Sequence, residues 1–348
     1  MKTTYVSTQA VAQATRRSVI QMQTELAKLQ REVTTGRKAD VGLALGERTG
    51  RTVALRSERE SLQTLIDTNS VASLRLSTTQ QMLLGISADA QSFLGILVDA
   101  RSDAASAAVT RDRASEKLSA FVAKLNSTLS GEYLFAGINT NVKPVGDYSA
   151  PASPAKLAVD NAFLARFGIA QTDPAISSIS AADMQSFLDN EFSALFDDPA
   201  WSTNWSTASA QSTEIRISTS ETVNSGAVAG DPAMRKIAMV YTMVSDLGLP
   251  QLSAGAYSVL VEKATGLLGN AIQGITTTQA RLGYSEQAVA DAKGRLSIQK
   301  DVIDIHIGEL EGVDPYEAST RISSLLTQIE TAYALTGRMQ QLSLLDYL

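Results

Sequence analysis

Residues 261–310 read VEKATGLLGNAIQGITTTQARLGYSEQAVADAKGRLSIQKDVIDIHIGEL, with a large aliphatic side chain at every seventh position. Such a spacing is typical of a helix that packs along one narrow seam. It predicts a single helix from roughly residue 255 to 311, about 80 Å long at a rise of 1.5 Å per residue. The positions three residues further on are small or polar, which predicts a narrow apolar stripe. The seam residues are Val261, Leu268, Ile275, Leu282, Val289, Leu296, Ile303 and Leu310.

A second seven-residue pattern lies in the first half of the chain and predicts a helix over residues 51–108. A buried Asn in such a seam fixes helix register, so we expect Asn69 to have this role. A third, shorter helix is expected over residues 113–130. None of these helices can bury its stripe alone, so we expect them to pack side by side as an elongated bundle. The seam positions of the second pattern are Leu55, Leu62, Asn69, Leu76, Leu83, Ala90 and Leu97.

Both ends of the chain are predicted to be helical and to carry an apolar stripe. The first stripe stops at Gly36, a residue suited to end a helix. The stretch GVDPYEAS (312–319) breaks the long helix, and a last helix begins near Pro315. Apolar stripes at chain ends are unfavourable for a monomer, so we predict that these helices bury their leucines only against identical neighbours. The predicted assembly residues are Leu26, Leu29, Val33, Ile322, Leu325, Ile329, Leu342, Leu344 and Leu345.

Residues 139–232 have a different composition from the helical segments. They hold six of the eight prolines and both tryptophans, and STEIRISTSETV (212–223) alternates polar and aliphatic residues as strands do. We predict a small, exposed α+β or β domain inserted in a mainly α fold. The expected division is a terminal assembly helix (1–40), the first half of a helical rod (41–138), the inserted outer domain (139–232), the second half of the rod (233–312) and a last assembly helix (313–348).

No catalytic, cofactor or metal site can be recognised. The chain has no cysteine and a single histidine, His306, which disfavours thiol chemistry and the common zinc sites. The glycines of GLALGERTG (42–50) fit neither a dinucleotide fingerprint nor a phosphate loop. The paired carboxylates Asp197–Asp198 and Glu309/Glu311 are expected to be exposed, with little reason for shifted pKa values. We therefore predict an architectural protein that is not an enzyme.

The charge distribution and the lengths of the apolar runs argue against nucleic acid and membranes as partners. Residues 1–60 carry eleven basic against six acidic side chains, but no aromatic residues alternate with them as in nucleic-acid binders. No apolar run suits a secretory signal, and none approaches the roughly 18 residues of a membrane span. We expect neither nucleic-acid binding nor membrane insertion.

Three stretches resemble the flagellin superfamily of bacterial flagella. ELAKLQREVTTGRKA (25–39) is similar to its N-terminal signature, and LNSTLSGEYLFAG (125–137) to the stretch that precedes its variable insert. ETAYALTGRMQQLSLLDYL (330–348) resembles the end of the hook-associated protein 3 family, the hook-filament junction proteins. The resemblance covers about residues 1–140 and 235–348. The chain departs from the common pattern after Gly36, where it reads RKADVGLALGERTG.

This resemblance implies a secreted structural protein of the extracellular flagellum, which serves motility and needs no cofactor. It implies type III export without a cleaved signal peptide, with an export chaperone as a partner. It also implies a tubular assembly of identical subunits between the hook-side junction protein and flagellin. The terminal helices would line the inner tube. Alternatives are a filament flagellin, a cytoplasmic signalling coiled coil, and an enzyme with Asp197, Asp198, Trp201 and Trp205 in a sugar-binding cleft.

Overall fold

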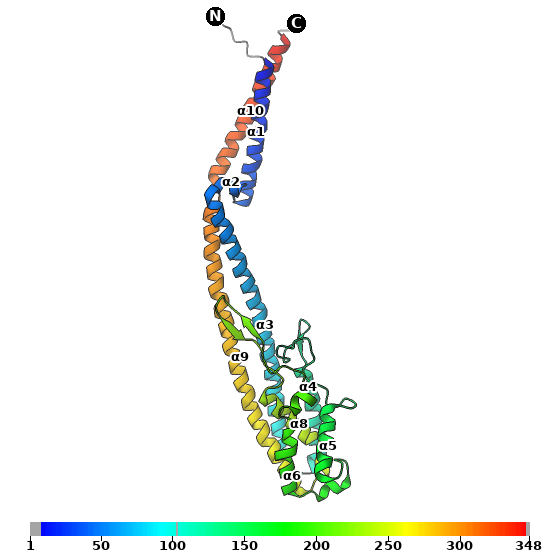
Figure 1. Ribbon diagram of the computed structural model, residues 1–348. Coiled ribbons are helices and arrows are strands. Elements are labelled where there is room, and N and C mark those ends of the chain that lie inside the picture. Colours follow the sequence, from blue (N-terminus) through cyan, green and yellow to red (C-terminus); the bar gives the residue numbers. More distant parts are fainter. Residues whose placement is uncertain (1–7, 102–103, 346–348) are drawn as a thin grey trace. The chain divides into compact units, whose positions relative to one another are not determined.

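The computed structural model describes residues 8–101 and 104–345 and confirms a mainly α fold with long helices from both chain ends (Figure 1). Two compact units are formed. Unit 1 comprises residues 1–64 and 296–348, and unit 2 comprises residues 65–295. The long helices α3 (Thr49–Ala100) and α9 (Ala254–Glu311) contribute residues to both units.

Unit 1 combines the two ends of the chain. Helices α1 (Thr8–Thr35) and α10 (Pro315–Leu345) lie side by side (Figure 1), and the short helices α2 (Val41–Leu45) and η1 (Gly46–Arg48) lead from α1 into α3. Gly36 ends α1 with a φ of 66°, a left-handed conformation that glycine adopts without strain. Next to it, the backbone N–H of Lys38 donates to the carbonyl of Glu311 at 2.9 Å, and that of Val313 donates to the carbonyl of Gly36 at 3.2 Å. These bonds tie the two crossing segments together.

Unit 2 packs helices around the remaining parts of α3 and α9. Its longer helices are α4 (Ala107–Leu125), α5 (Pro154–Phe167) and α8 (Pro232–Asp246), followed in length by α6 (Ala181–Phe187) and α7 (Ala200–Asn204). Short helical turns lie at η2 (Ala104–Ser106), η3 (Pro174–Ser178), η4 (Leu188–Phe192) and η5 (Leu249–Gln251). Two antiparallel strand pairs are present, β1 (Thr128–Leu129) with β2 (Glu132–Tyr133) and β3 (Glu214–Arg216) with β4 (Thr222–Asn224).

Most seam positions predicted for the two long helices are buried, whereas Leu55 and Leu310 are half-buried. Large aliphatic side chains at a seven-residue spacing share one helix face, and the free energy of removing that face from water drives the packing. The companion positions of α9 from Ala264 to Ala292 are buried as well, so in unit 2 its buried face is wider than the predicted stripe, whereas Gln299 and His306 are exposed. The buried seam residues are Leu62, Asn69, Leu76, Leu83, Leu268, Ile275, Leu282, Val289, Leu296 and Ile303.

Several expectations about element ends and the insert need correction. The predicted helix 51–108 ends at Ala100, and the one expected at 113–130 is α4, followed at once by strand β1. The strands expected in 212–223 form the β3–β4 pair, but most regular structure in 139–232 is helical. The segment was predicted to be exposed because of its polar composition, but it has a buried aromatic interior. A few large side chains are enough to fill a small core. Its members include Phe163, Phe187, Phe192, Phe196, Trp201 and Trp205.

Asn69, the residue predicted to fix helix register, contacts the segment that joins the two strands of the β3–β4 pair. Its side-chain amide donates to the carbonyl of Ile217, next to strand β3, at 2.9 Å. The side chain is fully buried, and its Oδ1 has no hydrogen-bond partner among the described residues. Asn69 therefore anchors the β3–β4 pair on α3 and makes no such bond across the seam to α9.

Among the residues that the structure describes, one helical stretch, Val41–Ala100, is long and apolar enough to cross a membrane by length and composition, with a mean hydropathy of 1.3 in its most apolar part. This stretch contains no long uninterrupted apolar run, which is why the sequence did not predict a membrane span there. A core helix passes the same test. In unit 2, Leu83, Phe93 and Leu97 of α3 are buried against other protein elements, and Asp89 forms ion pairs with Lys117 and Lys124. The apolar composition of α3 thus serves the protein core.

Candidate assembly surface of the terminal helices

The α1–α10 pair buries only a thin apolar strip between its helices. Among the side chains that the structure describes, Val19 and Leu29 of α1 and Ala318 and Ile329 of α10 are buried. Gln23 adds one polar contact, donating from Nε2 to the hydroxyl of Tyr333 at 2.8 Å. Two helices cannot enclose a core as the helices of unit 2 do. Most apolar side chains of the pair therefore stay partly in contact with water.

The predicted assembly residues fall into three groups. Leu29 and Ile329 are buried within the chain, so the expectation that the terminal helices bury their leucines only against neighbours is wrong for these two. Leu26, Ile322 and Leu325 are half-buried, and Val33 is 37% exposed. The side chains of Leu342, Leu344 and Leu345 lie outside the described residues.

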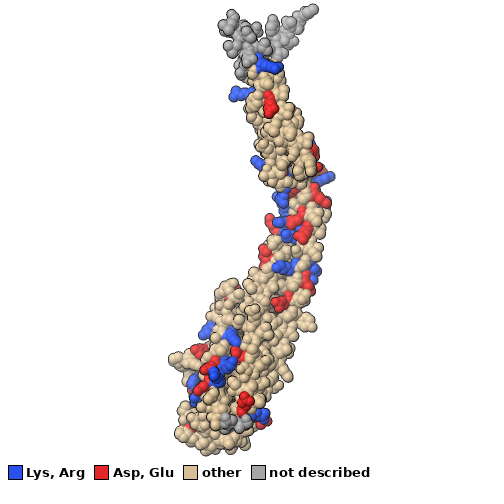
Figure 2. Space-filling model, turned by 180° about the vertical axis from the view of Figure 1, so that it is seen from behind, with Lys and Arg blue, Asp and Glu red and all other residues tan. Residues whose placement is uncertain are grey.

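The outward side of the pair carries apolar residues that the spacing argument did not single out. Ile20, Leu326 and Leu335 are 55%, 43% and 54% exposed. Leu335 also borders a shallow groove on α10, which small residues such as Thr331 and Ala332 line. Figure 2 shows few charged side chains on the visible face of this pair and many on the α3–α9 part of unit 1. Exposed apolar surface with few charges is typical of surfaces that bind protein.

A buried carboxylate lies where α9 meets α10. Glu311, which the sequence analysis expected to be exposed, is fully buried. Its Oε2 accepts a hydrogen bond from Arg56 at 2.6 Å and lies 3.8 Å from Arg37. This hydrogen bond raises the pKa of the Arg56 guanidinium. Glu311 lies at the end of the buried face of α9, and Arg37 and Arg56 both approach its carboxylate there. These two arginines compensate for the burial of the negative charge.

A second ion pair joins α3 to α9 in unit 1. Arg59 donates from Nε to Asp304 at 2.5 Å. Partial burial disfavours the charged form of Asp304, but the hydrogen bond and charge of Arg59 outweigh that effect and hold its pKa below the usual range. This ion pair helps to hold α3 and α9 side by side.

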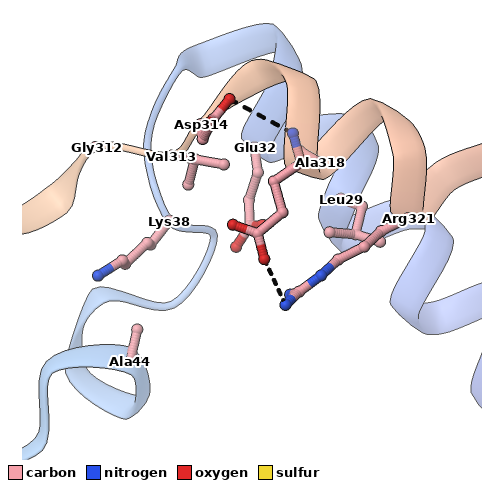
Figure 3. A pocket seen from close by; sticks show the side chains of 10 residues that line it. Leu29, Glu32, Lys38, Ala44, Gly312, Val313, Asp314, Ala318 and Arg321 are labelled. Carbon is pink, nitrogen blue, oxygen red and sulfur yellow. Dashed lines mark hydrogen bonds and ion pairs between the residues drawn. The ribbon is translucent and has the colours of Figure 1, made fainter.

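Figure 3 shows the cleft beside this junction, about 280 Å³ in volume. Its charged groups are largely satisfied within the protein. Glu317 pairs with Arg321 at 2.7 Å, Glu32 accepts from the backbone N–H of Ala39 at 2.8 Å, and Lys38 donates to the carbonyl of Leu310 at 3.2 Å. Among the described lining residues, none is a nucleophile placed beside a base. The remaining lining residues are Leu29, Ala44, Gly312, Val313, Asp314 and Ala318.

The residues of the alternative enzyme hypothesis do not form an open sugar site. Trp201 and Trp205 are each 2% exposed and stack on one another, with ring centroids 5.6 Å apart. Asp198 accepts a hydrogen bond from Arg235 at 2.5 Å, which holds the pKa of this carboxyl below its usual range. A general acid in glycoside cleavage needs a raised pKa instead. The neighbouring Asp197 is exposed.

The described residues also offer no metal centre. Within residues 8–101 and 104–345, no three His, Asp or Glu side chains gather as ligands. His306 is half-exposed, and its Nδ1 lies 3.3 Å from the carboxylate of Glu309 one helical turn away. The features that remain are helical: a pair of terminal helices with exposed apolar surface, tied to two long packed helices. They define a helical assembly subunit.

Comparison with known proteins identifies the family of this subunit. Residues 6–140 match the bacterial flagellin N-terminal helical region, and residues 265–348 match the bacterial flagellin C-terminal helical region. Together these regions span more than half of the sequence, and the chain belongs to the flagellin family. This family is structural and non-enzymatic, and membership implies self-assembly in the extracellular flagellum.

A solved structure from Vibrio parahaemolyticus, provisionally described as a flagellar hook-associated protein, has a similar fold. Its TM-score is 0.52 at 10% sequence identity, and the similarity covers 76% of this chain and 97% of that one. At this identity the similarity concerns the fold alone. No curated protein matches the chain.

Proposed function

We propose that this protein forms the junction between the flagellar hook and the flagellin filament. In this proposal, α1 and α10 pack against the same helices of identical subunits and line the inner tube of the assembly. The main observation in support of this proposal is the partial exposure of apolar residues on both terminal helices, for example Ile20 and Leu335. The neighbouring partners are the hook-side junction protein on one side and flagellin on the other, and the subunit is exported without a cleaved signal, bound beforehand to an export chaperone.

The energetics of the terminal pair favour such an assembly. Complete burial of a leucine or isoleucine side chain contributes about 1.5–3 kcal/mol. Ile20, Leu326 and Leu335 retain about half of their surface in water, so their burial between subunits adds a few kcal/mol per copy. Each copy contributes the same surface, and the gain recurs along the tube.

The junction role, as opposed to a filament role, is supported by the resemblance of residues 330–348 to the hook-associated protein 3 family. The fold similarity to the Vibrio structure agrees with it. A filament flagellin is the second candidate, because both family regions of the chain are named for flagellin.

Deletion of the protein separates the two candidates. A junction subunit is required for filament attachment, so its loss should leave bare hooks in electron micrographs and flagellin monomers in the medium. Bare hooks without flagellin in the medium would show instead that this chain is the filament subunit. Filaments of normal length would contradict both candidates.

Two point variants test the terminal helices themselves. Leu326→Asp and Leu344→Asp should leave the helical content unchanged and abolish complementation of the deletion, because a carboxylate cannot be buried unpaired between subunits. The matched control is Leu157→Asp, since Leu157 is 48% exposed on α5 of unit 2. It should complement fully. Normal filaments with Leu326→Asp would exclude the outward face of α10 from the assembly.

A further inference from the structure

The short helix α2 presents an apolar surface that the described structure covers only in part, at Val41 and Leu45. Its sequence is VGLAL, yet none of its five residues is buried, and Leu43 is 79% exposed. The helix lies in the stretch that departs from the flagellin pattern after Gly36. It is an apolar projection of unit 1.

This projection is held in place by local hydrogen bonds. Asp40 caps the helix, accepting from the backbone N–H of Leu43 at 2.9 Å. The hydroxyl of Thr49 donates to the carbonyl of Gly42 at 3.2 Å from the far side. A surface preorganised in this way loses little conformational entropy when it binds.

A matching apolar stripe lies on α9 of the same unit. Ile298, Val302 and Ile305 are 67%, 48% and 62% exposed. At about 100° per residue these three lie within roughly 60° of each other, on the side of the helix opposite Ile303 and Ile307. The latter two are buried, so the outer stripe is not needed for packing within the chain.

The two surfaces carry opposite charge. Residues 37–51 around α2 have four basic and two acidic side chains, whereas residues 298–309 have three acidic side chains and one lysine. Arg48 and Arg51 beside α2 are exposed, as is Asp301 beside the stripe, and none of the three forms an ion pair among the described residues. Such complementarity favours one orientation of docking.

We propose that α2 of one copy docks on the outer stripe of α9 in a second copy, with Leu43 against Val302 and Arg51 near Asp301. The two surfaces differ, so the contact is heterologous and continues from copy to copy as a ring or tube. This inference rests on the proposed self-assembly and adds a contact outside the terminal helices.

Cysteine cross-linking tests the contact directly, because the chain has no cysteine of its own. The full-length variant Leu43→Cys/Val302→Cys is assembled, treated with a short bismaleimide and separated on a denaturing gel. A ladder of covalent oligomers is expected, since each copy contributes one thiol to each of two neighbours. Each single variant should give at most dimers. Both positions are exposed, so the substitutions should not impair folding.

A matched control fixes the background of random collisions. Leu43→Cys/Val53→Cys carries its second thiol at another exposed valine of unit 1, where Val53 is 62% exposed. It should yield less than a tenth of the ladder. Assembly that sediments normally with no ladder above this control would overturn the α2–α9 contact and leave the proposed function standing. A chain that neither sediments nor cross-links would overturn both.

Charge reversal gives an independent readout of the same contact. Arg51→Glu and Asp301→Arg should each raise the critical concentration for assembly severalfold, and the double variant should recover most of the loss. Equal or additive losses in the double variant would show that the two residues do not meet.

Discussion

Replacing Arg56 by Met should weaken the α9–α10 junction more than replacing Glu311 by Met, although both changes break the same ion pair. Glu311 is fully buried, whereas the side chain of Arg56 is 48% exposed. Without Arg56 the buried carboxylate keeps only Arg37, at 3.8 Å. Without Glu311 both arginines can be hydrated.

The structure sets the magnitudes of the two effects. Removing one partner of a buried pair costs about 3–5 kcal/mol when the other charge stays buried and unpaired. Arg37 can move closer to Glu311, so we expect about 2–3 kcal/mol for Arg56→Met. Glu311→Met loses the same hydrogen bond but also removes the desolvation penalty of the carboxylate, so we expect about 1 kcal/mol or less. The double variant should resemble Glu311→Met.

Native-state amide exchange measures this difference where it arises. The backbone N–H groups of Lys38 and Val313 donate across the junction to Glu311 and Gly36, so their exchange reports its opening. A difference of about 2 kcal/mol corresponds to roughly 30-fold faster exchange in Arg56→Met than in Glu311→Met. The amide of Asn126, bonded to Val122 in unit 2, serves as the control and should not change. Equal exchange in the two variants, or faster exchange in Glu311→Met, would refute the reasoning.

Three further changes test unit 2. Leu83→Ala should destabilise unit 2 by about 2–5 kcal/mol in urea titrations, because it opens a cavity in a fully buried seam; a loss below 1 kcal/mol would contradict tight packing there. Asn69→Ala leaves the carbonyl of Ile217 without its donor and should cost about 1–3 kcal/mol, with faster amide exchange confined to β3–β4; an unchanged strand pair would exclude the anchoring role. Burial disfavours ionisation of Asp89, but hydrogen bonds from Lys117 and Lys124 outweigh this effect and lower the pKa of the carboxyl. The carboxylate therefore stabilises the fold above pH about 4, and this stabilisation is lost as the pH falls through the lowered pKa. Thermal melts from pH 6 to pH 2 should therefore fall less steeply for Asp89→Asn, and parallel curves would contradict this assignment.

Local pattern was sufficient for the long helices. The seven-residue spacing through Leu268 and Leu282 predicts α9 to within one residue at each end, because a helix face repeats at fixed sequence intervals. The end of α3 at Ala100 was missed, since apolar spacing continues past the point where the chain turns. Spacing alone cannot show which of two apolar faces is covered.

Contacts between segments far apart in sequence determine which polar side chains are buried and which partners they have. The burial of Glu311 depends on Arg56, 255 residues earlier, and Asn69 meets Ile217 across 148 residues. Neither partner can be inferred from neighbouring sequence, because a buried charge or amide is tolerated only when folding brings a polar partner to it.

The sequence by itself determined the helical class, the long seams and the apolar character of the chain ends, since each depends on periodicity within one segment. Only the tertiary structure decided which apolar residues remain available to other copies. Leu29 and Ile329 are enclosed by the pairing of α1 with α10, whereas Leu43 and Ile298 stay exposed. Hydrophobicity is a property of a residue, but burial is a property of its neighbours, and those are set when segments far apart in sequence meet.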